Sequence, residues 1–162
     1  MRRPQNSKEQ KDNYSGKKKK HTSKILILTN QSKEIIGMTP VYVGKSHDFS
    51  MFKKEEISDL IPPKTLVYVD TGFEGIDKLV EKSQVRKPKK KPKSRKLNGG
   101  EQHGNRVISS KRIIVEHAIG GFKKFKITAN IFRGITKTMD KAFRIAAGLW
   151  NLHLKFKAGE LT

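Results

Sequence analysis

The stretch KILILTNQSKEIIGMTPVYV, from Lys24 to Val43, indicates how the fold begins. Ile25 to Leu28 is continuously apolar, and a short polar turn from Asn30 to Lys33 separates it from a second apolar segment. Two such segments joined by a short turn predict an antiparallel hairpin. Because Pro40 has no backbone N–H for a neighbouring strand, we expect the second strand at the edge of a sheet.

The segments that follow alternate between helix and strand. Residues 46–61 (SHDFSMFKKEEISDLI) have apolar residues at helical spacing, with Ser46 or Asp48 as the capping residue and two prolines after the end. The run from Leu66 to Val69 is typical of a strand buried on both faces, and it ends at Asp70 before a Thr-Gly turn. Residues 73–82 again show helical spacing, which predicts a helix returning over the sheet.

The second half of the chain is richer in predicted helix. Residues 86–96 contain eight basic residues, two prolines and no acid, so we expect an exposed, mobile loop. A helix is predicted at residues 105–120, irregular structure or a short strand at 125–134, and a long helix at 138–156. This order of elements predicts the α/β class, with a mixed sheet flanked by helices.

The predicted domain organisation is simple. We expect a flexible polar lead-in at residues 1–16, one domain at 17–157 that includes a basic loop at 84–100, and a tail at 158–162.

The charge of the chain points to its partner. Thirty-six Lys and Arg residues against 15 Asp and Glu residues give a net charge of +21. A charge of this size predicts a polyanionic partner, most simply nucleic acid; the alternative is a surface made basic for solubility alone. The absence of cysteine excludes disulfide scaffolds and Cys-based zinc sites, and no run approaches the roughly 20 apolar residues of a membrane span. We therefore expect a cytoplasmic protein associated with nucleic acid.

Two acids are placed where they could do chemistry. Asp70 follows the most apolar strand, at the end where α/β sheets gather ligands, although it could equally form the turn before Thr-Gly. Glu116 shares one helix face with Ser109, Arg112, Gly120 and Lys123, and its alternative role is an exposed ion pair with Arg112. Two converging carboxylates could hold Mg²⁺, which prefers oxygen ligands, and a pair of such ions could promote phosphodiester cleavage.

At these residues the sequence resembles the catalytic domain of DDE-superfamily transposases, in the group that includes insertion sequence five and Harbinger-like elements. The matching stretches are YSGKKKKHTSK (14–24), GKSHDFSMFK (44–53), VYVDTGFEGI (67–76), SSKRIIVEHAIGGFKKF (109–125) and AAGLWNLHL (146–154). The resemblance implies a ribonuclease-H-like fold and metal-dependent cleavage and strand transfer at transposon ends. It also implies that Asp70 and Glu116 are catalytic and bind Mg²⁺ or Mn²⁺, two ions in the intact enzyme.

The resemblance also implies a missing acid. The family's triad begins with an aspartate on a first strand before the YSGKKKKHT block, and neither Glu9 nor Asp12 has its position. We therefore expect the first strand, its acid and the N-terminal DNA-binding region to be absent, and this polypeptide to be inactive alone. The polypeptide would be either the product of a downstream reading frame or a decayed copy of a transposase. Its possible protein partners are the polypeptide of the upstream frame and further copies of itself. The alternative functions are a non-catalytic nucleic-acid-binding protein and an inhibitor of an intact transposase.

Other residues have two interpretations each. His47 and Asp48 are either auxiliary metal ligands or a helix cap with a neighbouring histidine. Arg112 is a further candidate for an auxiliary residue of the site. Trp150 is expected in the core rather than as a base-stacking platform, and Asn151 is expected to bond within the fold. The basic loop is either an electrostatic tether for DNA or a solvated insertion. The residues predicted to bind DNA are Lys17, Lys18, Lys19, Lys20, Lys24, Arg112, Lys123 and Lys124.

Overall fold

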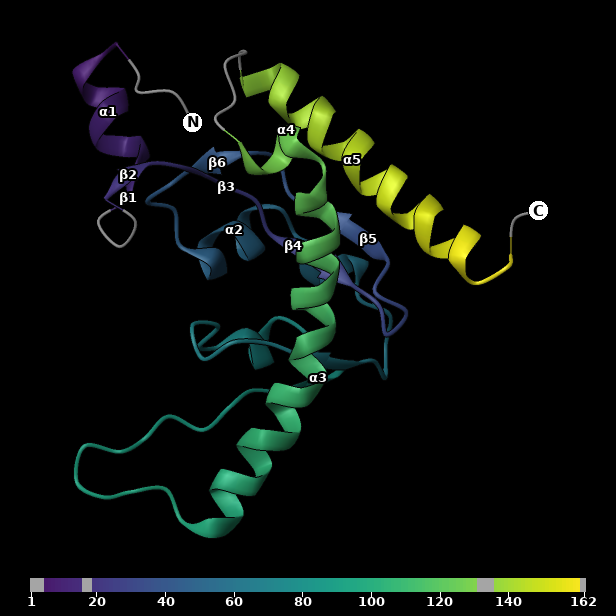
Figure 1. Cartoon of the computed structure of the whole chain (residues 1–162). Coiled ribbons are helices and arrows are strands. Elements are labelled where there is room, and N and C mark those ends of the chain that lie inside the picture. Colours follow the sequence, from purple (N-terminus) through teal and green to yellow (C-terminus); the bar gives the residue numbers. More distant parts are fainter. Residues whose placement is uncertain (1–4, 16–18, 131–135, 161–162) are drawn as a thin grey trace. The chain divides into compact units, whose positions relative to one another are not determined.

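The computed structural model describes residues 5–15, 19–130 and 136–160, which form helices and short strands (Figure 1). The predicted α/β class is confirmed. The chain divides into two compact units, which are described separately: unit 1 is Met1–Ser46 with Val115–Thr162, and unit 2 is His47–Ile114. Among the described residues the strands pair two by two, in four ladders, rather than in the single mixed sheet expected.

The predicted hairpin is present in unit 1. β4 (Ile27–Thr29) pairs antiparallel with β5 (Ile35–Met38), and β3 (Ser23–Lys24) pairs antiparallel with β6 (Tyr42–Val43). Both ladders join the same two segments of chain, so they are the two parts of one long hairpin. The prediction is thus confirmed in its pairing and in the position of its turn.

The second strand of this hairpin is not continuous as predicted, because it breaks between β5 and β6. At the break the Thr39 N–H donates to the Leu26 carbonyl at 3.0 Å, while the Leu26 N–H donates to the Thr39 hydroxyl at 3.0 Å. The hydroxyl of Thr39, whose residue is only 2% exposed, thereby takes the place of a backbone acceptor. Pro40 follows directly and has no N–H with which to continue the ladder, which explains the interruption.

The polar lead-in predicted at residues 1–16 contains regular structure. α1 (Ser7–Asn13) begins where the Asn6 side chain accepts a hydrogen bond from the Lys8 N–H at 2.9 Å. β1 (Tyr14–Ser15) then pairs antiparallel with β2 (Lys20–His21). An ion pair between Asp12 and Lys45 ties α1 to the end of the long hairpin. A side-chain cap and an ion pair thus support a helix for which the sequence shows no apolar periodicity.

The core of unit 1 lies between the hairpin and two helices. α5 (Thr136–Lys157) confirms the long C-terminal helix, and it packs against β5 and against the last turns of α3 (Gly99–Lys124). The rings of Phe122 and Phe143 meet edge to face, with centroids 5.7 Å apart. The buried residues of this cluster are Ile35, Phe122, Met139, Phe143, Ala146, Ala147 and Trp150.

Two neighbouring residues of α5 attach the helix to the hairpin by hydrogen bonds. The Trp150 indole N–H donates to the Lys33 carbonyl at 2.9 Å, and its ring is buried. The Asn151 side chain accepts from the Ile35 N–H at 2.8 Å and donates to the Ile35 carbonyl at 2.9 Å. The core role of Trp150 and the hydrogen-bonding role of Asn151 are both confirmed.

Unit 2 begins with a helix that is shorter than predicted. Residues 46–61 form α2 (Asp48–Lys54) and a 3-10 turn, η1 (Ile57–Leu60), instead of one helix. Glu56 separates them because it adopts a left-handed conformation with φ of 48°. The capping prediction was also wrong: His47 has the N-cap position without a side-chain cap bond, and Asp48 is the first helical residue.

The strand before Asp70 is less buried than predicted. β7 (Leu66–Tyr68) pairs in parallel with β8 (Gln84–Arg86), and Leu66 is 45% exposed. Val67, Tyr68 and Val69 are half-buried, so the apolar run is not covered on both faces. β8 also takes the first residues of the predicted basic loop, and the predicted helix at residues 73–82 is reduced to the 3-10 turn η2 (Ile76–Lys78).

The apolar spacing at residues 73–82 has another cause than a helix. Phe73, Ile76 and Val80 are buried, and the Phe73 ring meets Phe52 edge to face at 6.1 Å. Gly75 has a φ of +81°, which interrupts any helix there. Tight turns thus bury three of the four apolar residues that show helical spacing, and the fourth, Leu79, is exposed.

The remaining helices differ from prediction in extent. α3 spans 26 residues and is longer at both ends than the predicted residues 105–120. The predicted irregular segment or strand at residues 125–134 contains a short helix, α4 (Lys126–Ala129), and residues 131–134 lie outside the described part. In the described part of the chain, no helix combines the length and apolar character that crossing a membrane requires.

Two adjacent glycines of α3 give a test of the packing in unit 1. A Cβ at Gly121 would lie 2.2 Å from the Trp150 ring, whereas a Cβ at Gly120 would meet no described atom within 4 Å. We expect Gly121→Ala to lower the free energy of unfolding by about 1–3 kcal/mol through overpacking. Gly120→Ala should raise it by about 0.5–1 kcal/mol through helix propensity. Urea unfolding of both variants measures the difference, and equal effects would contradict the described packing.

Candidate functional site

Asp70 lies two residues beyond the end of β7 and shapes the turn that follows. Its carbonyl accepts from the Phe73 N–H at 3.1 Å, and its side-chain Oδ1 accepts from the Thr71 N–H at 2.7 Å. The turn-forming role left open by the sequence is therefore present. The side chain nevertheless remains 58% exposed, so its carboxylate can still reach a ligand.

The second oxygen of Asp70 faces a cation on α3. Arg112 Nη2 lies 3.4 Å from Asp70 Oδ2, and both residues belong to unit 2. This distance exceeds the 2.7–2.9 Å of a tight charge-assisted hydrogen bond, so the pair is loose. The sequence offered Arg112 as a partner for Glu116, one helical turn away, but the guanidinium is paired with Asp70 instead.

Glu116 lies on the exposed side of α3 in unit 1. Ala118 and Phe122 point into the core of that unit, which directs Glu116 outward. The predicted face of the helix is present, since Ser109, Gly120 and Lys123 are exposed as well. Asp70 and Glu116 belong to different units, so the convergence of their carboxylates stays a prediction.

The candidate auxiliary residues His47 and Asp48 lie at the start of α2. His47 has the N-cap position and supplies no side-chain capping bond, and Asp48 is the first helical residue, so the capping residue is not the one that the sequence predicted. Their role as metal ligands stays a prediction. Within the described ranges, no three side chains of His, Asp or Glu gather into a group that could hold a metal ion.

The residues predicted to bind DNA have different environments. Lys17 and Lys18 lie outside the described residues. Lys19 and Lys20 are exposed in the β1–β2 hairpin, and Lys123 and Lys124 are exposed in the last turn of α3. Lys24 has a structural contact, because its ammonium donates to the Ser46 carbonyl at 2.7 Å.

The basic segment after β8 is exposed, as predicted, but it is held in place by acids of unit 2. Residues 87–98, here called the arm, contain no helix or strand and lead back to the start of α3 (Figure 1). Lys87 pairs with Asp77 at 2.8 Å, and Lys90 pairs with Glu74. These contacts attach the arm to the turns that follow Asp70.

Glu101 gathers the largest group of contacts to the arm. Its carboxylate accepts two bonds from the Arg95 guanidinium, at 2.7 and 2.8 Å, and one from Lys89 at 2.7 Å. The Asn98 N–H donates to the same carboxylate at 3.0 Å, while the Glu101 N–H donates to the Asn98 side chain at 2.8 Å. The last two bonds form a reciprocal cap at the start of α3.

These contacts shift the pKa of the carboxyl group. The hydrogen bonds from Arg95, then Lys89 and then the Asn98 backbone hold the pKa of Glu101 well below its ordinary value. Glu101 is not among the residues that we predicted from the sequence to be functional. Its signal was nevertheless available, since an Asn followed three residues later by Glu is a recognised helix start.

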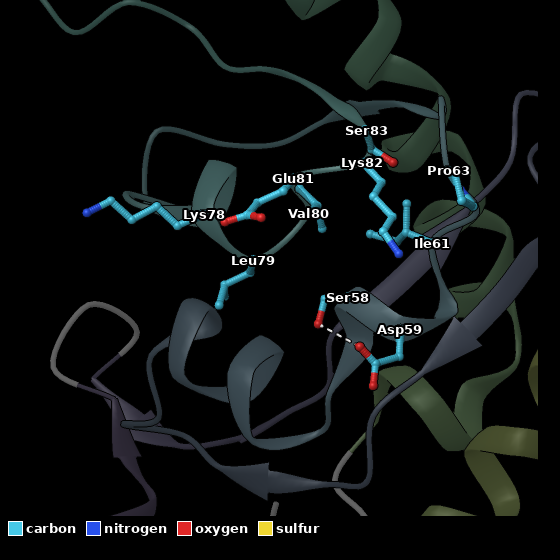
Figure 2. A pocket seen from close by; sticks show the side chains of 10 residues that line it. All are labelled: Ser58, Asp59, Ile61, Pro63, Lys78, Leu79, Val80, Glu81, Lys82 and Ser83. Atoms are coloured by element: carbon cyan, nitrogen blue, oxygen red, sulfur yellow. Dashed lines mark hydrogen bonds between the residues drawn. The ribbon is translucent and has the colours of Figure 1, made fainter.

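A hollow of about 480 Å³ lies elsewhere in unit 2, between η1 and the segment at residues 78–83 (Figure 2). Its lining mixes the acids Asp59 and Glu81 with Lys78 and Lys82. Ser58 contributes a hydroxyl that bonds to Asp59 at 3.3 Å. The hollow contains none of the residues predicted to form the site, so we do not assign the chemistry to it.

Comparison with known proteins identifies the family. The sequence profile described as DDE superfamily endonuclease matches residues 1–151, which include Asp70 and Glu116. The chain belongs to the DDE superfamily endonuclease family. Members of this family generally use divalent metal ions. The resemblance found in the sequence is thus confirmed at the level of the superfamily, and the narrower group stays a prediction.

A relative supports the same assignment. The chain is 33% identical over 153 residues to a probable transposase for insertion sequence element IS702 from Microchaete diplosiphon. The alignment covers 93% of this chain and 53% of the relative. The chain therefore spans about half the length of the curated relative it matches. No solved structure matches the chain significantly.

The contacts of Glu101 predict the pH dependence of the arm. Because its pKa is lowered in the folded protein, the ion pairs stabilise the fold above the ordinary Glu value of 4.5, and this contribution is lost as the pH falls through the lowered pKa. We expect Arg95→Gln to raise the pKa of Glu101 toward 4.5, measured by NMR titration of the side-chain carboxyl group. The control Lys93→Gln removes an equal charge without a contact to Glu101, and an equal shift in both variants would contradict the described pairing.

Proposed function

We propose that this member of the DDE endonuclease family is the catalytic domain of a transposase, which cleaves and joins DNA strands at transposon ends with divalent metal ions. In this proposal Asp70 and Glu116 are the metal-binding carboxylates, and the fold is of the ribonuclease-H type. One observation carries the proposal: the carboxylate of Asp70 is exposed after β7 and has only a loose ion pair, with Arg112 at 3.4 Å.

The chemistry of both acids fits a hard divalent cation. Magnesium and manganese prefer oxygen ligands, and a carboxylate retains lone pairs after accepting one or two hydrogen bonds. Asp70 and Glu116 are exposed, so a metal ion and a DNA phosphate could both approach them. A bound ion would activate a water molecule and stabilise the leaving oxygen of a phosphodiester.

The residues around Asp70 have defined tasks in this proposal. The Thr71 N–H, which donates to Oδ1, orients the carboxylate, and the guanidinium of Arg112 keeps positive charge beside Oδ2. A phosphate group brought to this place would meet the same positive charge. Lys123 and Lys124 place further cations on the exposed end of α3, where they could bind the DNA backbone.

The metal-binding role can be tested without any cleavage reaction. We expect the protein to bind Mn²⁺, observed by electron paramagnetic resonance, and Asp70→Ala or Glu116→Ala to weaken binding strongly, since each removes a charged oxygen ligand. Asp77→Asn is the matched control, because Asp77 is also exposed and paired with one basic residue. If the Asp77 variant lost as much affinity as the other two, the assignment of the ligands would be wrong.

The polypeptide of 162 residues is expected not to cleave DNA by itself, because only two of the three acids of the family have matching positions in it. Two dications repel each other and need a bridging carboxylate, so occupancy by two metals should be low. The measurement is incubation with terminal-repeat DNA in Mg²⁺ or Mn²⁺. Cleavage that disappears in Asp70→Ala would contradict this expectation while supporting the role of Asp70.

A further inference from the structure

The arm has a defined shape although it contains no regular structure. The Lys89 N–H donates to the Asn105 side-chain oxygen at 2.8 Å, and the Asn105 amide donates to the Lys89 carbonyl at 3.0 Å. Asn105 thus satisfies both backbone groups of Lys89, while Glu101 holds the Lys89 ammonium. The side chain of Glu101 is only 10% exposed because the arm covers it.

The basic residues of the arm fall into two sets. The first set is paired with acids of unit 2 and consists of Lys87, Lys89, Lys90 and Arg95. The second set consists of Lys91, Lys93 and Lys96, which are exposed and form no ion pair with any described residue. The acids thus hold the shape of the arm and leave three cations for another partner.

An arrangement of this kind favours a polyanion. Three cations within six residues repel one another, and a partner with repeated negative charges relieves that repulsion. A loop that is already held in shape also loses less conformational entropy on binding than a mobile one. The regular phosphates of duplex DNA meet both requirements without any need to read bases.

The arm also begins beside the candidate catalytic carboxylate. β7 and β8 are parallel, so Asp70 and the first residue of the arm leave the ladder at the same edge. The Val69 N–H donates to the Arg86 carbonyl at 3.1 Å, which keeps the two segments together as they leave. Glu74 and Asp77, in the turns after Asp70, then hold the arm.

We propose that the arm is a preorganised clamp for duplex DNA, in which Lys91, Lys93 and Lys96 bind backbone phosphates independently of base sequence. Lys87, Lys89, Lys90 and Arg95 hold its shape through Asp77, Glu74 and Glu101. DNA bound by the arm would pass the end of the β7–β8 ladder, where Asp70 lies. This inference rests on the proposed function only in taking DNA as the partner.

The test compares two variants that lose the same charge. Lys91, Lys93 and Lys96 are replaced by Ala in one, and three exposed lysines of α5, Lys141, Lys155 and Lys157, are replaced in the other. Binding of a random-sequence duplex is followed by fluorescence anisotropy over a salt series in EDTA. We expect the arm variant to reduce the slope of log affinity against log salt by about 3, and the α5 variant to reduce it by less than about 1.

A further variant tests the shape of the arm. Asn105→Ala keeps every charge and removes the two hydrogen bonds to the Lys89 backbone, so it should weaken the affinity for duplex DNA several-fold. The slope of log affinity against log salt should stay near the value of the unchanged protein. Circular dichroism confirms that each variant is folded.

Each contrary result has a distinct meaning. Equal salt slopes in the two lysine variants would overturn the proposal that the arm is a clamp. An unchanged affinity of Asn105→Ala for duplex DNA would overturn it as well. Stronger competition by single-stranded RNA than by duplex DNA would overturn the choice of partner. Because EDTA removes divalent ions, a failure of Asp70 or Glu116 to bind metal leaves this result unaffected. If the unchanged protein does not bind DNA at all, the proposed partner itself is wrong.

Discussion

The close contact between Gly121 and Trp150 is the constraint on which unit 1 depends. Any side chain at Gly121 would clash with the indole ring of Trp150. The ring therefore packs directly against the backbone of α3, which sets the distance between α3 and α5. Trp150 also bonds to Lys33, and the next residue, Asn151, bonds to Ile35, so the same short segment of α5 seats the hairpin. This contact fixes which side of α3 faces the core, and thereby leaves Glu116 exposed.

The two units use the same device to attach an extended segment to a helix. Asn151 satisfies the N–H and the carbonyl of Ile35, and Asn105 does the same for Lys89. A side-chain amide has one acceptor and two donors, so it can replace a neighbouring strand at a single residue. Short strands with few partners would otherwise leave backbone groups without hydrogen bonds. The two asparagine side chains therefore supply backbone hydrogen bonds that the short ladders do not provide.

The acids of this basic protein are few, and many of them have structural tasks. Glu101, Glu74, Asp77 and Asp12 each neutralise lysine or arginine residues that are close in space. Asp70 is as exposed as Asp77, but it combines a turn-forming bond with a loose ion pair of 3.4 Å, whereas Asp77 pairs with Lys87 at 2.8 Å. This difference in environment is what makes Asp70 a candidate for chemistry, since its sequence position alone did not separate it from an ordinary turn residue.

The sequence by itself determined the features that depend on neighbouring residues. The hairpin, the turn after Asp70, the long C-terminal helix and the α/β class followed from apolar periodicity and turn chemistry, which act over a few residues. Periodicity misled at residues 73–82, where turns bury Phe73 and Ile76 at the spacing of a helix.

Only the tertiary structure decided which partner each charged residue has. Arg112 could pair with Glu116 on its own helix, but the fold brings Asp70 to it. The acids that hold the arm come from two separate segments, the turns that contain Glu74 and Asp77 and the start of α3. The net charge of +21 is a sum over the composition, so the sequence alone predicts that the partner is negatively charged. The distance between opposite charges, by contrast, depends on how remote segments pack, and local sequence does not contain it.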